Sequence, residues 1–171
     1  MTNDFASSII ATPVGPLYVR VVAGHLRQLS FCAKPRIPAF ADIETDAVLT
    51  AVRSQLDEYF RGRRRAFDLP LDLTGPQFYV RVWHALREIP YGETISYGGL
   101  AQRLNLVGAA RAVGAANGAN PIVIVVPCHR VIGADGSLVG FGGGLQRKQA
   151  LLDLERGRVP LAISASDFAQ E

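Results

Sequence analysis

The chain has 171 residues, of which 49% are hydrophobic and 19% charged, and its formal net charge is +3. This composition predicts a globular protein with a buried core and excludes an intrinsically disordered chain. No apolar run approaches the roughly 18 residues of a membrane-spanning helix, and the N-terminus lacks the pattern of a signal peptide. We therefore expect a cytoplasmic protein that contacts no membrane.

The first part of the chain predicts a small antiparallel sheet. Apolar and β-branched runs at residues 9–12, 17–22 and 26–31 are separated by a proline-containing turn and by Gly24. This arrangement is typical of a strand meander. Residues 34–45 are expected to form a loop.

A helix is expected after this loop. Asp46 can cap its start. Apolar residues then follow at helical spacing, namely Val48, Val52, Leu56, Tyr59 and Phe60. The arginine-rich run at residues 61–65 comes next and is interpreted as a solvated surface segment.

A domain junction is predicted at residues 67–76, where the sequence FDLPLDLTGP contains the prolines and the glycine typical of a boundary. We expect an N-terminal lobe at residues 1–75, a second domain at 76–160 and a tail at 161–171. The second domain holds nine basic and five acidic residues, a net charge of +4. This surplus permits binding to nucleic acid without proving it.

The second domain is predicted to be mostly helical. Its first helix has one apolar face, made of Phe78, Val82, Trp83 and Leu86. Pro90 must end this helix. Ser96 can cap a short helix over residues 97–104, and a second helix over 108–119 follows closely, which is the pattern of a helix-turn-helix.

The end of the second domain predicts three more elements. Residues 122–126 are expected to form a buried strand, a glycine-rich loop spans 140–144, and a last helix covers about 146–156. The fold class expected for the whole chain is α+β. Its N-terminal lobe is a small antiparallel sheet with a helix, and its C-terminal lobe is mostly helical with a short strand.

Cys128 is the first candidate for chemistry, since it follows the predicted buried strand directly and precedes a histidine and an arginine. A free cysteine is more often a core residue. Neighbouring cationic groups would, however, lower the pKa of the thiol and make it nucleophilic. Cys32 and Cys128 are both interpreted as free thiols. The three histidines are scattered, so no metal site is expected.

His129 is the second candidate. Adjacent residues of an extended segment point to opposite sides, so His129 could reach Cys128 only through a local turn or an intervening water. A lone histidine is usually structural. Glu155, on the last predicted helix, is the nearest candidate for a partner that orients the imidazole ring.

The segment GAARAVGAANGA at residues 108–119 is built almost entirely of alanine and glycine, and Arg111 is its only charged residue. One interpretation is a helix packed tightly in the core. The other is a helix whose backbone approaches the DNA minor groove, which is only about 6 Å wide. Arg111 could then fill a gap in the base stack.

Four blocks of the sequence resemble the methylated-DNA–protein-cysteine methyltransferases, also called O6-alkylguanine-DNA alkyltransferases. They are ISYGGLA around Tyr97, RAVGAANGANP from Arg111, IVVPCHRVIG around Cys128, and the ending GGGLQRKQALLDLE. The match runs almost without a gap from Phe78 to Glu155. The first 75 residues match only loosely.

The resemblance implies DNA repair by direct reversal of damage. The alkyl group of O6-alkylguanine, typically a methyl, would pass from double-stranded DNA irreversibly to Cys128, so that each molecule acts once. The damaged base would be flipped out of the duplex from the minor groove. The resemblance implies no cofactor, no metal and no obligate protein partner.

Roles for individual residues also follow from the resemblance. His129 would act as the base through a water, and Glu155 would orient its ring. Tyr97 would help to turn the guanine out and donate a proton to its ring nitrogen. Asn120 would order the active-site loop.

The same resemblance assigns the contacts to DNA. Arg111 would take the vacated place in the base stack, and Ala112 and Gly114 on the same helix would lie against the duplex. Tyr97 would contact DNA as well. A base pocket would be formed by Val131, Phe141 and Gly142. Some relatives carry tyrosine at position 141, so phenylalanine keeps stacking but loses a hydroxyl contact, and residue 142 offers only its backbone.

Three alternatives remain from the residues alone. A module that binds alkylguanine without repairing it is the main one, but it would not need Cys128. A cysteine hydrolase normally has its histidine far from the cysteine in sequence. A transcription regulator would present several long polar side chains on its second helix, and this helix has almost none.

Overall fold

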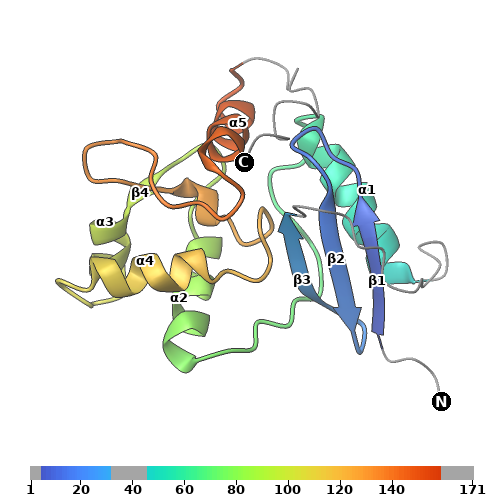
Figure 1. Ribbon diagram of the computed structural model, residues 1–171, viewed down its shortest axis with the longest axis horizontal. Coiled ribbons are helices and arrows are strands. Elements are labelled where there is room, and N and C mark those ends of the chain that lie inside the picture. Colours follow the sequence, from blue (N-terminus) through green and yellow to red (C-terminus); the bar gives the residue numbers. More distant parts are fainter. Residues whose placement is uncertain (1–4, 32–45, 159–171) are drawn as a thin grey trace. The chain divides into compact units, whose positions relative to one another are not determined.

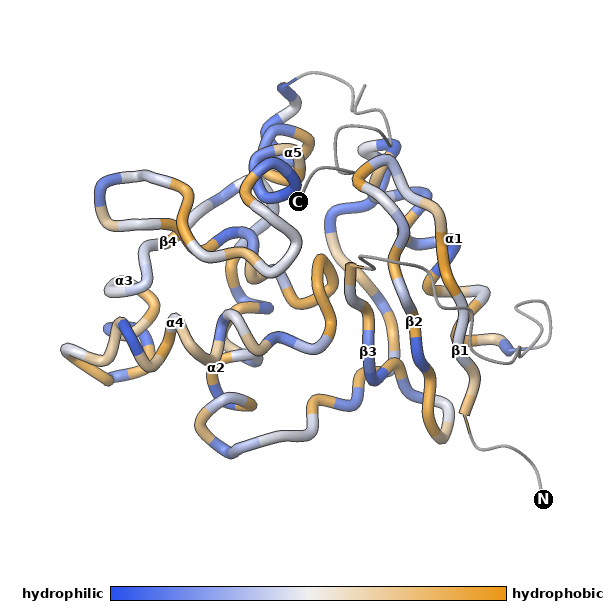
Figure 2. Tube along the Cα trace, in the orientation of Figure 1, coloured by the Kyte–Doolittle hydropathy of each residue, from blue (hydrophilic) through white to orange (hydrophobic). Residues whose placement is uncertain are grey.

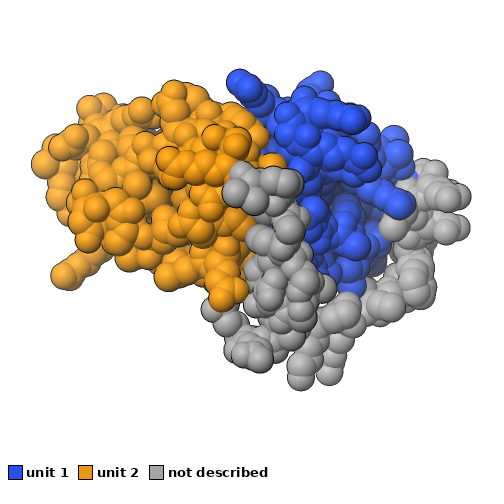
Figure 3. Space-filling model, turned by 90° about the horizontal axis from the view of Figure 1, so that it is seen from above, with its two compact units in different colours: residues 1–72, 159–171 blue, residues 73–158 orange. Residues whose placement is uncertain are grey.

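The computed structural model describes residues 5–31 and 46–158 (Figure 1). Cys32, the predicted loop at 34–45 and the predicted tail at 161–171 lie outside these residues. The chain forms two compact units, and the boundary between them falls between Asp72 and Leu73 (Figure 3). Across the described ranges, no helix has the length and apolar character needed to cross a membrane.

The N-terminal unit contains an antiparallel meander of β1 (Phe5–Ile10), β2 (Leu17–Val22) and β3 (His25–Phe31), which confirms the predicted topology. The first strand starts and ends earlier than the sequence predicted. Ser7 and Ser8 interrupt the apolar run but pair with Arg20 and Val19 across the ladder. The predicted strand end at Thr12 is wrong, because Thr12 accepts a hydrogen bond from the Gly15 amide at 3.0 Å and begins a turn.

Helix α1 (Ala47–Phe60) packs against all three strands. The predicted cap is confirmed: the Asp46 side chain accepts hydrogen bonds from the Val48 and Leu49 amides at 2.8 and 2.9 Å. The buried face consists of Leu49, Val52, Leu56 and Tyr59. Leu49 therefore takes the core position that the sequence assigned to Val48.

Part of the predicted linker pairs with the sheet. The Leu26 amide donates to the Pro70 carbonyl at 2.7 Å, and the Asp72 amide donates to the Leu26 carbonyl at 2.9 Å. Residues 70–72 thus cover part of the outer edge of β3 and satisfy backbone groups that an edge strand would otherwise expose.

The C-terminal unit is mainly helical. Its helices are α2 (Gln77–Arg87), α3 (Tyr97–Arg103), α4 (Ala110–Gly118), α5 (Leu145–Glu155) and the 3₁₀ turn η1 (Cys128–Arg130). Helices α3 and α4 form the predicted helix pair, and both pack within the unit. The Ser96 hydroxyl accepts a hydrogen bond from the Gly99 amide at 3.0 Å, as a cap should.

Trp83 joins α2 to the second helix of this pair. It is 3% exposed, and its indole N–H donates to the Ala116 carbonyl at 2.8 Å. Because Ala116 is small and buried, the large ring can pack against the α4 backbone. Trp83 therefore fixes the buried side of α4, and the opposite side of the helix faces solvent.

The predicted strand at residues 122–126 is wrong. The segment, coloured as hydrophobic in Figure 2, is a tight turn in which the Val126 amide donates to the Ile122 carbonyl at 2.9 Å. Ile124 has a φ of 71°, a left-handed conformation that is costly for a β-branched residue. The apolar run was a sign of burial, and periodicity could not distinguish a buried strand from a buried turn.

Two very short strands were not predicted. Strand β4 (Ile95–Ser96) pairs in parallel with β5 (Val131–Ile132). Two residues are too few for a periodic signal. This pairing ties the start of α3 to the segment that follows the candidate cysteine.

Candidate active site and helix pair

Cys128 lies at the start of η1, directly after the buried turn, and only 4% of it is exposed. Asn120 holds this turn from both ends. Its side-chain amide donates to the Val126 carbonyl at 2.7 Å, and its side-chain oxygen accepts from the Ile122 amide at 3.0 Å. Asn120 therefore fixes the path of the chain into Cys128.

The thiol of Cys128 is not pre-ionised. Burial raises its pKa, and this effect outweighs the hydrogen bond from the Asn120 side chain and the positive charge of Lys148, which act in the opposite direction. The expectation that cationic neighbours would lower the pKa is therefore wrong in its net direction. A thiol in this state needs a base before it can act as a nucleophile.

His129 and Glu155 form a buried pair, as the spacing had suggested. The His129 Nε2 lies 2.7 Å from the Glu155 Oε1, and His129 is fully buried. The other ring nitrogen, Nδ1, has no hydrogen-bond partner among the described residues. If the proton sits on Nε2 and is donated to the carboxylate, the lone pair on Nδ1 is the basic site.

The charge states of this pair are set by burial and by Arg130. Burial lowers the pKa of His129, the hydrogen bond and charge of Glu155 raise it, and the net direction is downward. Burial alone would raise the pKa of Glu155, but hydrogen bonds and charges from His129 and Arg130 hold it well below its usual range. At neutral pH the pair is a neutral imidazole and an ionised carboxylate.

Tyr97 begins α3 and is half-buried between other elements of the same unit. Its hydroxyl donates to the Val139 carbonyl at 3.1 Å. Burial raises its pKa, and a thiolate at Cys128 would act in the same direction. A tyrosine in this position is a proton donor at neutral pH.

Three buried polar residues at the site were not singled out from the sequence: Asn117, Arg130 and Lys148. Lys148 is fully buried, its ammonium donates to the Val139 carbonyl at 2.8 Å, and it lies 5.9 Å from the centre of the Tyr97 ring. A sequence signal did exist. Lys148 and Glu155 are seven residues apart and share a helix face with Leu151 and Leu152, where polar residues are unexpected.

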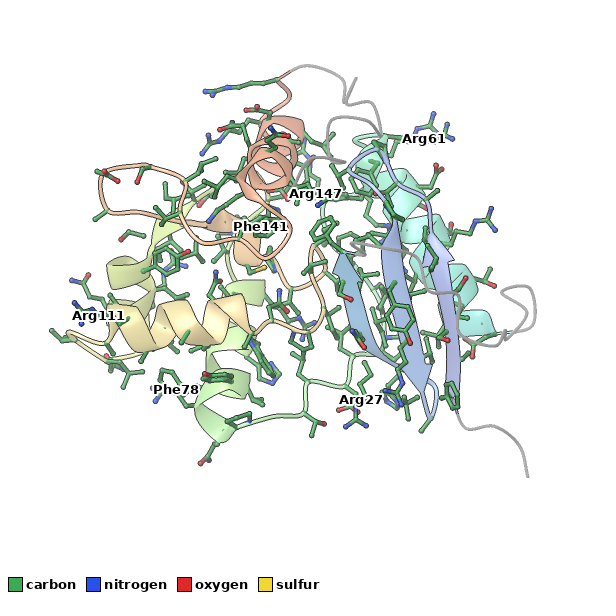
Figure 4. The ribbon with its side chains drawn as sticks, in the orientation of Figure 1. Arg27, Arg61, Phe78, Arg111, Phe141 and Arg147 are labelled. Carbon is green, nitrogen blue, oxygen red and sulfur yellow. The ribbon has the colours of Figure 1, made fainter. Side chains whose placement is uncertain are left out.

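The predicted base-pocket residues do not share one environment. Val131 is fully buried in β5, Phe141 is partly exposed, and Gly142 is exposed. Figure 4 shows Phe141 on the loop that precedes α5. The structure thus places these residues on two segments of the C-terminal unit, with Cys128 in the same unit.

Of the predicted DNA-contacting residues, Tyr97 begins α3 and the other three lie on α4. Arg111 and Ala112 are exposed at its start, where Figure 4 shows Arg111 projecting from the end of the helix. Gly114 is partly exposed, and a methyl group at this position would lie 3.7 Å from the Tyr97 ring. Val113, Ala116 and Asn117 of α4 are buried, as a helix packed in the core requires, while Ala112, Ala115 and Gly118 are small and exposed.

No group of three histidine, cysteine, aspartate or glutamate side chains suited to a metal ion occurs in the described part of the chain. Among the protonable groups of the site, His129 and Glu155 are joined by a hydrogen bond, and the Lys148 ammonium lies over the Tyr97 ring. Together, fold and site define a class: a protein with a helix-turn-helix unit that carries a buried cysteine next to a histidine–carboxylate pair.

Comparisons with known proteins agree with this class. Residues 77–157 match the model of the 6-O-methylguanine DNA methyltransferase DNA-binding domain, and residues 6–73 match that of the 6-O-methylguanine DNA methyltransferase ribonuclease-like domain. A methylated-DNA–protein-cysteine methyltransferase of Mycobacterium tuberculosis is 48% identical over 162 residues, which cover 92% of this chain and 96% of the relative.

Two further comparisons extend this likeness. The inducible methylated-DNA–protein-cysteine methyltransferase of Bacillus subtilis is 43% identical over 156 residues, covering 91% of this chain and 87% of the relative. The crystal structure of Mycobacterium tuberculosis OGT in complex with DNA has a TM-score of 0.80 at 48% identity and covers 89% of this chain and 93% of its own. The chain belongs to the 6-O-methylguanine DNA methyltransferase family, and it is a methyltransferase of DNA repair.

Proposed function

We propose that the protein binds duplex DNA through α3 and α4 and transfers the alkyl group of a flipped O6-alkylguanine to the sulfur of Cys128. The observation that carries the proposal is the neutral His129 beside this cysteine, with Nε2 held by Glu155 at 2.7 Å and Nδ1 free to accept a proton. A buried thiol whose pKa is raised gains most from such a base.

The transfer is a displacement at the alkyl carbon. His129 takes the thiol proton, directly or through a water, and the resulting thiolate forms a carbon–sulfur bond while the bond from that carbon to the guanine O6 breaks. The electron pair of the broken bond passes into the guanine ring. Tyr97, whose raised pKa keeps it protonated, supplies the proton that leaves guanine neutral.

The product is a thioether. A thioether is not hydrolysed by water under cellular conditions. Each molecule is therefore consumed by one transfer. Neither the displacement nor the two proton transfers uses a nucleotide or a redox partner.

Binding is proposed from the minor-groove side. The exposed face of α4 carries small residues, so its backbone can approach a narrow groove that excludes bulky side chains. Arg111, at the start of α4, would fill the space left by the flipped base. Ala112 lies beside it, and Gly114 packs toward Tyr97.

The base pocket is proposed to lie between Cys128 and the loop before α5. Phe141 would stack on the flipped guanine, and the backbone of Val131 and Gly142 would contact its edges. The module that binds alkylguanine without transfer gains no support from the comparisons, and it would leave the His129–Glu155 pair without a role.

The test is a single-turnover reaction with a duplex oligonucleotide that carries one O6-methylguanine. We expect one equivalent of protein to gain the mass of one methylene group, on the peptide that contains Cys128. Cys128→Ser should bind the same duplex and gain no mass. Labelling of Cys32, or transfer by the serine variant, would refute the assignment.

A further inference from the structure

We propose that Arg130 is a positioning residue of alkyl transfer, which acts through Glu155 to keep His129 neutral and ready to accept the proton of Cys128. The proposal rests on the proposed function, because it gives Arg130 a task only if His129 is the base. The hydrogen bonds of Arg130 go to Glu155 and to the Ile89 carbonyl, so it would act on the cysteine through Glu155 and His129.

The Arg130 guanidinium is buried, with 6% of the residue exposed, and it uses all three of its nitrogens. Its Nε donates to the Glu155 Oε2 and its Nη2 to the Glu155 Oε1, both at 2.9 Å. Its Nη1 donates to the Ile89 carbonyl at 2.6 Å. This two-bond fork fixes the plane of the carboxylate.

The carboxylate of Glu155 is thereby shared. The oxygen that His129 contacts at 2.7 Å also accepts a hydrogen bond from Arg130, and the second oxygen also accepts from the Gly92 amide at 3.1 Å. Both oxygens are fixed by more than one donor. The direction in which Glu155 presents its oxygen to the imidazole is therefore set largely by Arg130 and by the turn at residues 89–92.

The charges around His129 lead to a second consequence. Glu155 on α5 is negative, while Arg130 on η1 and Lys148 on α5 are positive, and the Cys128 thiol is uncharged before reaction. Because Arg130 already neutralises the carboxylate, a proton on His129 would be an uncompensated charge in a buried site. A carboxylate without the arginine would instead favour a protonated, ion-paired imidazole.

This arrangement predicts the direction of a pH effect. A protonated His129 cannot accept the thiol proton, so transfer fails at low pH where the imidazole is charged. The positive charges of Arg130 and Lys148 both lower the pKa of His129, in the same direction as its burial. Removal of the arginine charge should therefore move the loss of activity to higher pH.

A purely structural role predicts a different result. Arg130 also joins η1 to the turn before β4, where its guanidinium lies 5.8 Å from the centre of the Tyr91 ring. If this anchoring were its only role, a substitution would lower stability and reduce the rate of transfer by the same factor at every pH. The pH profile separates the two roles.

The experiment measures single-turnover transfer from an O6-methylguanine duplex between about pH 5 and pH 9, around the ordinary histidine pKa of about 6.5. For the wild type we expect the acid limb of this profile, where the rate of transfer falls as pH decreases, to lie below the ordinary histidine pKa. For Arg130→Met, which removes the charge at similar volume, we expect a shift of the limb upward by about one pH unit or more. Arg130→Lys should shift it less.

The matched control is Tyr91→Leu, which removes the ring next to the guanidinium and keeps the charge. Its stability should fall while its acid limb stays in place. If Arg130→Met lowers the rate equally at all pH values and leaves the limb unchanged, the proposal is wrong. If Arg130→Met does not fold, Arg130→Gln serves the same comparison.

A second measurement does not depend on activity. The ring nitrogens of His129 can be titrated by NMR in unreacted wild-type protein. We expect the ring to stay neutral, with its one proton on Nε2, as the pH falls to 6.5 and below. A ring that carries a proton on both nitrogens at or above pH 6.5 overturns the proposal even if transfer occurs. A wild type that titrates as expected but transfers no alkyl group would instead contradict the proposed function.

Discussion

Glu155 has both a chemical and a structural task, because its ionised carboxylate is the only negative charge described next to His129 and Arg130. Substitution by glutamine would leave the Arg130 charge buried without its partner. Removal of one member of a buried ion pair typically costs about 3–5 kcal/mol. We expect Glu155→Gln to lower the free energy of unfolding by that amount, measured by urea denaturation at pH 7, with Asp153→Asn on the same helix as the control.

The same carboxylate predicts how stability depends on pH. Because the folded-state pKa of Glu155 is held below its ordinary value of 4.5, its contribution is fully present above pH 4.5 and is lost as pH falls below it. The advantage of wild type over Glu155→Gln should therefore shrink between about pH 5 and the acid end of the titration. An advantage that does not change over this range would contradict the assignment.

Arg111 is expected to affect repair only where a base must leave the duplex. Flipping a base costs a few kcal/mol, and this cost is absent for the free base. We predict that Arg111→Ala slows transfer from duplex O6-methylguanine at least tenfold more than transfer from free O6-methylguanine. The checks are single-turnover rates on both substrates, and equal losses would mean that Arg111 supports the fold rather than the flip.

At the scale of elements, the exposed face of α4 is predicted to bind the duplex because its side chains are small. Ala112→Leu keeps a good helix former at an exposed position, so stability should change little. In a narrow groove the larger side chain should weaken duplex binding by about tenfold or more, equivalent to about 1.4 kcal/mol. Binding can be measured by fluorescence anisotropy, with Ala112→Ser as the size-matched control; unchanged binding by the leucine variant would exclude this face.

Two elements show where sequence patterns were sufficient and where they were not. Helix α1 could be predicted because its cap and its apolar spacing are local features; the cap is confirmed, and three of the predicted face residues are buried, with Leu49 in place of Val48. The turn at residues 122–126 could not, because its five apolar residues are equally compatible with a buried strand. Its shape depends on Asn120, whose side chain binds backbone groups up to six residues away, and that contact leaves no periodic signal.

For the whole molecule, transfer itself is predicted to lower stability. Cys128 is packed with 4% exposure, and the alkyl group stays on sulfur after the guanine leaves. Adding a methyl group to a packed site typically costs about 1–3 kcal/mol. The methylated protein should therefore melt several degrees lower, with a graded decrease for larger alkyl groups, as measured by calorimetry. A melting temperature that is equal or higher would refute a tightly packed thiol.

The sequence by itself determined the family, the α+β class, the meander, the helix pair and the candidate cysteine, because each is encoded by local spacing or by contiguous motifs. The tertiary structure alone decided the state of the site. It placed Arg130, Lys148 and Glu155 in one buried cluster, and burial then outweighed the cationic neighbours in raising the pKa of Cys128. Burial and the distances between charges depend on how distant segments pack, and no local pattern in the chain contains that information.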